Sequence, residues 1–443
     1  MRNTLLFILV CLALSCKKES ATESVQVMSG DMKTDVQILA ADSLQGRETG
    51  TPYELAAADY IAKRMKQSGL QPAGNENTYF QTFSFKPSSD PHQEAAFVDE
   101  KGDGFLTGTN VIGMIDNNAD HTVIIGAHYD HLGMGGEGSL HRGDAAVHNG
   151  ADDNASGVAV MLELGYRFRE SENETNFTAR FGSEEKENGV FLNKGGNFKN
   201  SNYLFIAFSG EEMGLLGSNY FTKNPTVDMD KANYMINMDM VGRLNDESVL
   251  AISGTGTTPR WKQVLKSANE DFELALSESG VGPSDHTSFY LNDIPVLHFF
   301  TGQHTDYHKP GDDANKLNYN GMQQIADYIE RVVVELNGAG KLPFRKTKNE
   351  SEEVPRFKVA LGVIPDYLFT GKGMRIDGVS EDKPAQKAGL QKGDIVIKLG
   401  DSTVVDMMSY MRVLSTYEAG DKAQVIVDRN GKKIEETITF QED

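Results

Sequence analysis

The sequence predicts an α/β protein in which a mixed β-sheet is sandwiched by helices, followed by a small β-rich domain. Short apolar, β-rich runs alternate with helical patterns over most of the 443 residues, and this alternation is typical of α/β folds. Histidine or carboxylate residues follow directly after several of the runs. Near the end, the pattern changes to strand-like runs with a hairpin signal at Asn430-Gly431, which indicates a separate domain.

The predicted elements follow one another at short intervals. A helical pattern begins near Pro52 and continues through Ile61 and Met65 until Gly69 ends it. Buried strands are predicted where short β-rich apolar runs occur. The predicted strands are 122–127, 203–208, 234–238 and 294–299, and the later predicted helices are 155–168 and 322–336.

The chain is long enough for two or three domains with large cores. We expect a first domain over residues 31–337, with an insertion at 170–200 where Asn, Glu, Gly and Lys are frequent and periodicity is weak. The insertion is either a plain surface loop or a flap near the mouth of a site. A linker at 338–353 and a final domain at 354–443 follow.

The charge balance argues against some partners. The chain has 43 basic and 64 acidic residues, which gives a net charge of −21. Because phosphate backbones bind basic surfaces, we expect no nucleic-acid partner. The acidic surface mainly favours solubility.

The first residues resemble a bacterial export signal. A short basic start precedes an apolar run that ends at Leu14 and is too short to span a bilayer as a helix. We expect a signal peptide over 1–15 and a polar tether over 16–30. Cys16 follows the small residues of a lipoprotein-type cleavage site, so we expect it to carry a lipid that anchors the protein in the cell envelope, facing the periplasm or the surface. The alternative is an ordinary cleaved signal with an incidental cysteine.

Five short segments supply histidine and carboxylate side chains in an order that suits a two-metal site. Zinc accepts both kinds of ligand. Histidine is otherwise scarce, since nine of the ten lie between residues 121 and 308. The segments are Ala127-His128-Tyr129-Asp130, Gly150-Ala151-Asp152-Asp153-Asn154, Ser209-Gly210-Glu211-Glu212, Asn237-Met238-Asp239 and Tyr307-His308-Lys309-Pro310.

Together these segments predict a two-metal hydrolase. Such a site needs a bridging carboxylate, terminal ligands on each ion and a base near the bridging water. Two ions about 3.5–4 Å apart polarise a carbonyl and generate hydroxide near neutral pH. The candidate ligands follow predicted strands, and open α/β sheets place their sites at strand ends.

The five segments resemble the signature of the co-catalytic zinc aminopeptidase family, whose relatives include glutamate carboxypeptidases and glutaminyl cyclases. The resemblance covers roughly residues 35–337, and the stretch 39–47 (Leu-Ala-Ala-Asp-Ser-Leu-Gln-Gly-Arg) resembles the usual beginning of the family. It implies the zinc exopeptidase type of fold and two Zn²⁺ ions per chain.

The resemblance also implies a set of metal ligands. His128 and Asp239 would bind one zinc ion. Glu212 and His308 would bind the other, and Asp153 would bridge the two.

The bridge has two candidates, Asp152 and Asp153. In the family the bridging aspartate directly precedes an Asn-Ala-Ser-Gly-like run, and here that run begins at Asn154. The resemblance therefore favours Asp153.

Glu211 is implied to be the general base rather than a ligand. Adjacent carboxylates on a turn can point in different directions, so one can bind metal while the other faces the water. A base in this position takes a proton from the water and passes it to the leaving amine. Asp130 would hydrogen-bond the His128 ring and fix its tautomer.

Three further residues are candidates near the substrate. Ser284-Asp285-His286 resembles a family segment close to the substrate, which singles out Asp285 and His286. Asp312 is the last acid of the family's Tyr-His-x-Pro-x-Asp pattern. Residues 281–283 contain no tyrosine, so the phenolic oxyanion donor of some relatives is not identified. No role is assigned to His131, His141, His148, His298 and His304.

The final domain resembles a PDZ domain. Ala360-Leu361-Gly362-Val363 resembles the carboxylate-binding loop, and residues 382–396 resemble the body of bacterial PDZ domains. In such a loop, successive backbone N–H groups hold a terminal carboxylate while the peptide adds as a strand. The resemblance implies capture of peptide or protein C-termini. The alternative is a docked scaffold that binds nothing.

These expectations combine into an exported, lipid-anchored zinc aminopeptidase that hydrolyses N-terminal residues of peptides, with Glu211 as general base. A carboxypeptidase or glutaminyl cyclase on the same scaffold is the first alternative. A non-catalytic protein that binds partners through the PDZ-like domain is the second.

Overall fold

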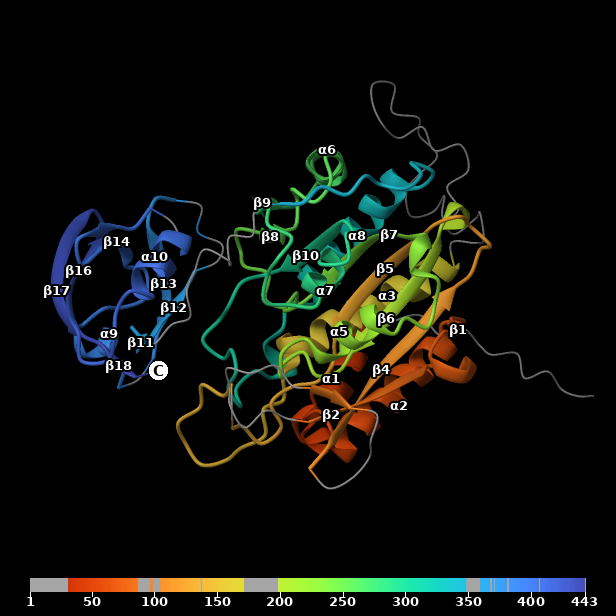
Figure 1. Ribbon diagram of the computed structural model, residues 1–443, viewed down its shortest axis with the longest axis horizontal. Coiled ribbons are helices and arrows are strands. Elements are labelled where there is room, and N and C mark those ends of the chain that lie inside the picture. Colours follow the sequence, from red (N-terminus) through yellow and green to blue (C-terminus); the bar gives the residue numbers. More distant parts are fainter. Residues whose placement is uncertain are drawn as a thin grey trace, which may run out of the picture.

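A mixed sheet of ten strands forms the centre of the first domain (Figure 1). Its strands are β1 (Gln71–Pro72), β2 (Phe80–Lys86), β3 (Ala96–Val98), β4 (Leu106–Ile115), β5 (Thr122–His128), β6 (Asn202–Phe208), β7 (Ala232–Met238), β8 (Val249–Ser253), β9 (Glu273–Leu276) and β10 (Val296–Phe300). The order is β3-β2-β4-β6-β5-β7-β10-β8-β9, with β1 beside β4. The central strands β6, β5, β7 and β10 run parallel, and β4 and β8 join them antiparallel.

The computed structural model describes most but not all of the chain. The predicted signal peptide and tether, and nearly all of the predicted insertion, lie outside the described residues. Within the described part, we find no helix that combines the length and hydropathy needed to cross a membrane. The described residues are 31–86, 96–98, 104–136, 138–170, 198–347, 359–366, 369, 371–380, 382–405 and 407–442.

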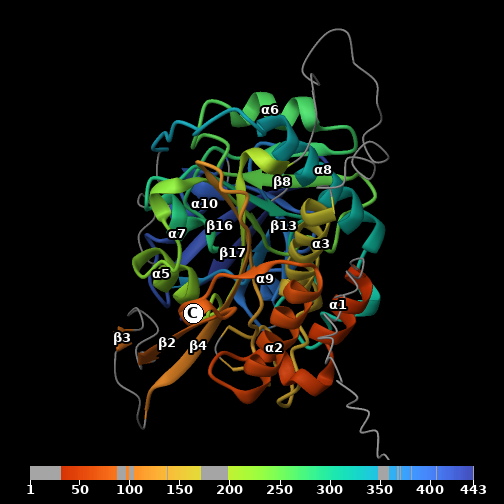
Figure 2. The same cartoon turned by 90° about the vertical axis from the view of Figure 1, so that its right-hand side faces the viewer.

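Helices cover both faces of the sheet, as predicted. Along β5, Val123 and Ile125 pack into a large core with the helices of one face, whereas Ile124 packs into a smaller core with those of the other. Figure 2 shows α1, α3 and α8 on one side and α5 and α7 on the opposite side. The helices are α1 (Met32–Leu39), α2 (Pro52–Gln67), α3 (Gly157–Glu170), α5 (Leu216–Lys223), α6 (Trp261–Ala268), α7 (His286–Tyr290) and α8 (Tyr319–Leu336).

The predicted elements are confirmed, with small differences at their ends. The hydroxyl of Thr51 accepts the Glu54 N–H and caps α2, and Pro52 occupies the first turn, where its missing N–H is harmless. The main shift concerns α3, which begins at Gly157 rather than at 155 because residues 151–156 form a separate irregular turn. That turn carries Asp153.

The topology brings the candidate ligands to one edge of the sheet. His128 is the last residue of β5, Asp239 directly follows β7, and Glu212 lies four residues after β6. Because these strands are parallel neighbours, their carboxyl ends meet at the same edge. Side chains that are more than 100 residues apart in the sequence therefore become neighbours.

The C-terminal domain is a separate β-rich body with its own core (blue in Figure 1). Its larger sheet has the order β12-β13-β14-β16-β17, with β15 beside β14, so β12 is an edge strand of the described sheet. The predicted hairpin is confirmed, since Asn430 and Gly431 join β16 to β17 and both have positive φ. The elements are β11 (Val359–Ala360), β12 (Val363–Pro365), β13 (Met374–Val379), α9 (Pro384–Lys387), β14 (Ile395–Leu399), β15 (Ser402–Thr403), α10 (Met407–Leu414), β16 (Lys422–Arg429), β17 (Lys432–Thr439) and β18 (Gln441–Glu442).

Residues 341–347, within the predicted linker 338–353, are docked on the first domain. The Leu342 N–H donates to Asn233 Oδ1 at 2.7 Å, and the Arg345 N–H donates to the Thr257 carbonyl at 2.7 Å. The Thr347 N–H donates to the Tyr290 hydroxyl at the end of α7, at 2.9 Å. We call residues 341–347 the docked segment.

Candidate metal centre

Two groups of potential ligands meet at the carboxyl edge of the sheet and share Asp153. In the first group, His128 Nε2 lies 3.3 Å from Asp153 Oδ1 and 3.3 Å from Asp239 Oδ1. In the second group, His308 Nε2 lies 3.2 Å from Asp153 Oδ2 and 3.3 Å from Glu212 Oε2. Each oxygen of the Asp153 carboxylate therefore faces a different group, which is the arrangement a bridging ligand requires.

The distances within each group suit ligands of one zinc ion. With metal–ligand bonds of about 2.0–2.1 Å and tetrahedral angles, two ligand atoms on the same zinc lie about 3.3 Å apart. The four distances above are all 3.2 or 3.3 Å. The five side chains expected from the family resemblance thus fit two zinc ions.

His131, for which the sequence predicted no role, lies in direct contact with the second group. Its Nδ1 is 2.7 Å from Glu212 Oε1 and 4.0 Å from Asp153 Oδ2. Proximity alone would admit His131 as a ligand, since His131, Asp153 and Glu212 offer atoms within 4.8 Å of one another. However, 2.7 Å is a hydrogen-bond distance, shorter than the spacing of two ligands on one ion. His308 therefore fits the ligand position better, and His131 fits a partner that holds Glu212.

In the metal-free protein, the carboxylates raise the pKa of His308 and the histidines lower the pKa of Glu212. Although burial opposes the effect, Glu212 and Asp153 raise the pKa of His308 to about 11. Burial and the charge of Asp153 would raise the pKa of Glu212, but contacts with His308 and His131 bring it to about 2. The carboxylates are thus held ready as anions, the form that binds a metal.

Asp152 faces away from both groups. Its Oδ1 accepts the Gly242 N–H at 2.6 Å, and its Oδ2 lies 3.2 Å from His304 Nε2. Of the two candidate bridges, only Asp153 therefore lies within the two groups of potential ligands. Asp312, predicted near the substrate, lies beneath this turn, where its Oδ2 accepts the N–H groups of Asp152 and Asp153 at 2.8 and 3.0 Å.

Glu211 lies beside the ligands, and its pKa is raised. Burial is the main cause, and the neighbouring carboxylates of Asp239, Glu212 and Asp285 add to it, while His128 opposes them. A carboxyl group that holds a proton more readily than usual suits a residue that accepts and returns one.

Asp130 supports the site differently from what the sequence predicted. Its carboxylate is 3.7 Å from His128 Nδ1, beyond hydrogen-bond distance, and the ring's nearer partner is the Asp130 backbone carbonyl at 3.3 Å. The carboxylate instead accepts the N–H of Glu211 at 3.1 Å and that of Glu212 at 3.4 Å. Asp130 therefore fixes the turn that carries both glutamates.

The two residues predicted from the Ser-Asp-His segment, Asp285 and His286, have different surroundings in the structure. Asp285 is buried near His128 and Asp239, and burial is the main cause that raises its pKa to about 7. His286 packs its ring on His298, with centroids 4.6 Å apart, and burial lowers its pKa well below the ordinary value. Asp285 thus belongs to the surroundings of the site, whereas His286 is a neutral packing residue.

Tyr307 is a site residue that the sequence reasoning missed. Its ring stacks on His308 with centroids 3.9 Å apart. Burial raises its pKa well above the ordinary value, and Asp153, Glu212, Glu211 and Asp239 add to that effect. The sequence signal for it is the Tyr307-His308 pair itself, since a tyrosine beside a candidate ligand lies at the site.

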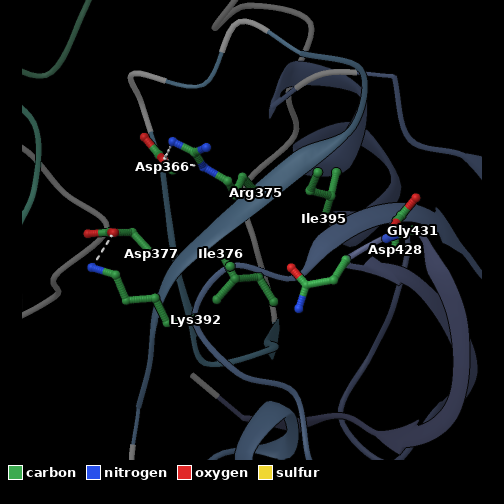
Figure 3. Close-up of a pocket in the computed structure, with 10 residues that line it drawn as sticks. Asp366, Arg375, Ile376, Asp377, Lys392, Ile395, Asp428 and Gly431 are labelled. Carbon is green, nitrogen blue, oxygen red and sulfur yellow. Dashed lines mark hydrogen bonds and ion pairs between the residues drawn. The ribbon is translucent and has the colours of Figure 1, made fainter. Parts of the chain in front are cut away.

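The predicted carboxylate loop of the C-terminal domain contains a glycine in the left-handed region. Gly362 has a φ of +77°, and a Cβ there would lie 2.1 Å from the Lys383 Cβ, so only glycine fits. Leu361 is buried in the core and Val363 begins the edge strand β12. A concavity of about 520 Å³ on this domain (Figure 3) is lined by other residues than the loop, and its Arg375 and Lys392 pair with Asp366 and Asp377.

Comparison with known families agrees with this geometry. Residues 110–333 match the model of peptidase family M28. The chain belongs to peptidase family M28. Residues 344–439 match the PDZ domain model, which confirms the predicted C-terminal domain.

Individual relatives are distant. A probable leucine aminopeptidase of Arthroderma otae is 27% identical over 242 residues, covering 53% of this chain and 58% of the relative. Aminopeptidase YwaD of Bacillus subtilis is 26% identical over 251 residues, covering 54% of this chain and 46% of the relative. The chain spans about half the length of these curated relatives.

Solved structures are more distant still. A zinc aminopeptidase from Bacillus subtilis superposes with a TM-score of 0.48 at 17% identity, covering 70% of this chain and 95% of that chain. A glutaminyl cyclase of Porphyromonas gingivalis also gives a TM-score of 0.48, at 18% identity, covering 69% of this chain and 96% of that chain.

Proposed function

We propose that this M28 family member is a two-zinc aminopeptidase that removes N-terminal residues from peptides. The observation that carries the proposal is the Asp153 carboxylate, whose two oxygens lie 3.3 Å from His128 Nε2 and 3.2 Å from His308 Nε2. The relatives named as aminopeptidases support the choice of reaction.

Zinc ions bound at the two groups would polarise the scissile carbonyl and make water acidic enough to attack near neutral pH. Glu211 takes a proton from that water and returns it to the leaving amine. Asp130 holds the backbone of Glu211 in place. Tyr307, which is half-buried and stacks on His308, is the candidate hydrogen-bond donor to the oxygen that becomes negative in the transition state.

The test is hydrolysis of a panel of aminoacyl-p-nitroanilides by residues 17–443 with added zinc, beside Glu211→Gln. General base catalysis contributes about 10²–10⁴-fold, so we expect a kcat loss in that range with zinc content unchanged. Equal kcat in both proteins would exclude Glu211 as the base. Tyr307→Phe should lower kcat about 10–10³-fold with little change in KM, since the donor acts mainly in the transition state.

The same scaffold leaves two other reactions to distinguish. An aminopeptidase loses activity when the substrate's N-terminus is acetylated, whereas a carboxypeptidase loses it when the C-terminus is amidated. A glutaminyl cyclase works with one zinc ion, so one metal per chain and cyclisation of an N-terminal glutamine peptide would favour that reaction. A zinc-loaded chain without any of these activities would favour the non-catalytic binding protein.

The C-terminal domain is proposed to capture peptide or protein C-termini. Within the described sheet, β12 has a strand partner on one side only, which suits strand addition. The left-handed Gly362 lets the loop turn directly before β12. A peptide with a free C-terminus should bind, while its amidated form and the Gly362→Asp variant should not. Equal binding of the free and amidated peptides would exclude carboxylate capture and favour the docked scaffold.

Export and lipid anchoring are proposals that rest on the N-terminal sequence alone. We propose that Cys16 is lipidated and ties the protein to the cell envelope. Cys16→Ser should release the protein from the membrane fraction without changing its kcat. Retention of Cys16→Ser on membranes would exclude the anchor.

A further inference from the structure

Arg47 is a buried cation next to the metal centre, and no role follows for it from the family match, which begins at residue 110. It ends the 3₁₀ segment Asp42–Arg47 that follows α1, and only 1% of its surface is exposed. A buried arginine is costly unless its guanidinium is fully hydrogen-bonded. Its partners therefore indicate what it does.

The guanidinium of Arg47 bonds to four backbone carbonyls from three separate parts of the chain. Its Nε donates to the Tyr129 carbonyl at 2.7 Å, and its Nη2 donates to the Gly150 carbonyl at 2.9 Å. Its Nη1 donates to the carbonyls of Leu39 and Asn149 at 2.5 and 2.7 Å. A planar fork with five N–H donors can make these bonds at once, which a lysine cannot.

Two of these contacts fix turns that carry metal ligands. Tyr129 stands directly after His128, and Gly150 stands three residues before Asp153. His128 and Asp153 are neighbours in the first group, where their ligand atoms are 3.3 Å apart. Arg47 thus ties the backbone of one ligand to the backbone of the other.

We propose that Arg47 is a positioning residue that sets the distance between His128 and Asp153 and thereby builds the first metal position. This inference rests on the proposed two-metal site. The second metal position is formed by Asp153, Glu212 and His308. Of these, only Asp153 lies on a turn that Arg47 holds, because Glu212 and His308 lie on other loops. Loss of Arg47 therefore weakens the two positions unequally.

The positive charge of Arg47 weakens metal binding nearby, whereas its hydrogen bonds to the ligand turns are proposed to strengthen it. The neighbouring carboxylates include Asp130, Asp153, Asp312 and Glu212, and burial lowers the pKa of Arg47 to about 10, so it stays protonated at neutral pH. Removing a positive charge beside a cation site would by itself strengthen metal binding. A drop in affinity after removal would therefore report lost positioning.

The experiment is a zinc titration by calorimetry of the metal-free full chain, comparing Arg47→Lys and Arg47→Met with the wild type. Each substitution is also combined with Asp239→Ala, so that zinc can bind only at the second position. It is combined separately with Glu212→Ala, so that zinc can bind only at the first position. We expect affinity at the first position to fall about 10–100-fold, the range for partners that orient ligands. We expect the second position to change less than about threefold, since only one of its ligands is held by Arg47.

Arg64 offers a matched control in the same part of the fold. It is a buried arginine of α2 whose guanidinium donates to a side chain of α1 and not to a ligand turn: its Nε and Nη2 bond Asp35 at 2.6 and 3.0 Å. Arg64→Lys and Arg64→Met should leave both affinities unchanged. The emission of Trp261, buried in the first domain, confirms folding of each variant.

Three outcomes overturn the inference. They are unchanged affinities in both Arg47 variants, equal losses at the two positions, and stronger binding in Arg47→Met, which would show that only the charge matters. A wild type that binds no zinc would instead overturn the proposed function itself.

Discussion

Two buried aspartates, one in each domain, use their charge in different ways. Asp394 of the C-terminal domain is fully buried, and its two oxygens accept hydrogen bonds from Arg429 Nε and Nη2 at 2.6 and 2.7 Å. Asp153 of the first domain is 3% exposed and faces two histidines with the carboxylates of Asp239 and Glu212 close by. Asp394 has a cation of its own, whereas Asp153 shares its two histidine neighbours with the carboxylates of Asp239 and Glu212.

The difference separates a stabilising charge from a functional one. A buried ion pair with its own hydrogen bonds satisfies both partners within the fold. A cluster in which three carboxylates share two histidines is only partly compensated within the fold, so a bound metal ion adds stability. The two domains should therefore respond differently to metal, to pH and to substitution.

Metal removal should give the largest effect, and only in the first domain. Zinc at about a thousandfold above its Kd stabilises the folded state by about 4 kcal/mol per site. Trp261 is the only tryptophan of the chain and lies in the first domain, so its emission follows that domain alone during urea unfolding. A chelator should shift the Trp261 midpoint and leave the calorimetric transition of the C-terminal domain in place. A shift of both transitions would contradict the comparison.

The pH should affect the metal-free first domain in a defined direction. The pKa of His308 is raised from 6.5 to about 11, chiefly by Glu212 and Asp153 acting against burial. A raised folded-state pKa gives stability that is present below 6.5 and lost as the pH rises towards 11. Without metal, the Trp261 midpoint should therefore fall between about pH 7 and pH 10. The fall should be smaller in His308→Gln, and equal slopes in the two proteins would rule out this cause.

The same proton links pH to metal binding. A histidine must lose its proton before it can bind zinc, so zinc affinity should rise with pH over this range. Calorimetry in buffers of different ionisation enthalpy should show proton release on binding.

Breaking the Asp394 pair should destabilise only the C-terminal domain. Asp394→Ala removes two hydrogen bonds to a charged partner, and we expect a loss of about 2 kcal/mol with kcat unchanged. Asp377→Ala is the matched control, because its pair with the 65% exposed Lys392 is worth less than about 1 kcal/mol. Equal losses in the two variants would show that burial of the pair is unimportant.

The docked segment should give the smallest effect. Tyr290→Phe removes the hydroxyl that accepts the Thr347 N–H, which should cost the first domain about 1 kcal/mol. Tyr53→Phe, at an exposed position of α2, should be neutral. If Tyr290→Phe is equally neutral, residues 341–347 contribute nothing to the stability of the first domain.

Much of the fold follows from local patterns, and the candidate ligands follow from the family resemblance. The run before His128 is apolar and β-rich, so the sequence itself predicts a strand that ends at a candidate ligand. The same holds for Asp239 after β7. The hairpin at Asn430-Gly431 was predictable because both residues tolerate positive φ.

Contacts between distant loops did not follow from the sequence. The carboxylate of Asp130 bonds the backbone at Glu211 and Glu212, and His131 contacts Glu212, because the turn after β5 folds against the turn after β6. No local pattern encodes that approach. Arg47 was missed for the same reason, since all its acceptors are backbone carbonyls and carry no residue signature.

The most direct measurement is the zinc content of four full-chain proteins after dialysis against a zinc buffer. A shared Asp153 predicts two ions in the wild type, one in Asp239→Ala, one in Glu212→Ala and none in Asp153→Ala. Two independent single-metal sites would instead leave one ion in Asp153→Ala. That result, or a wild type with fewer than two ions, would contradict a centre in which one carboxylate joins both positions.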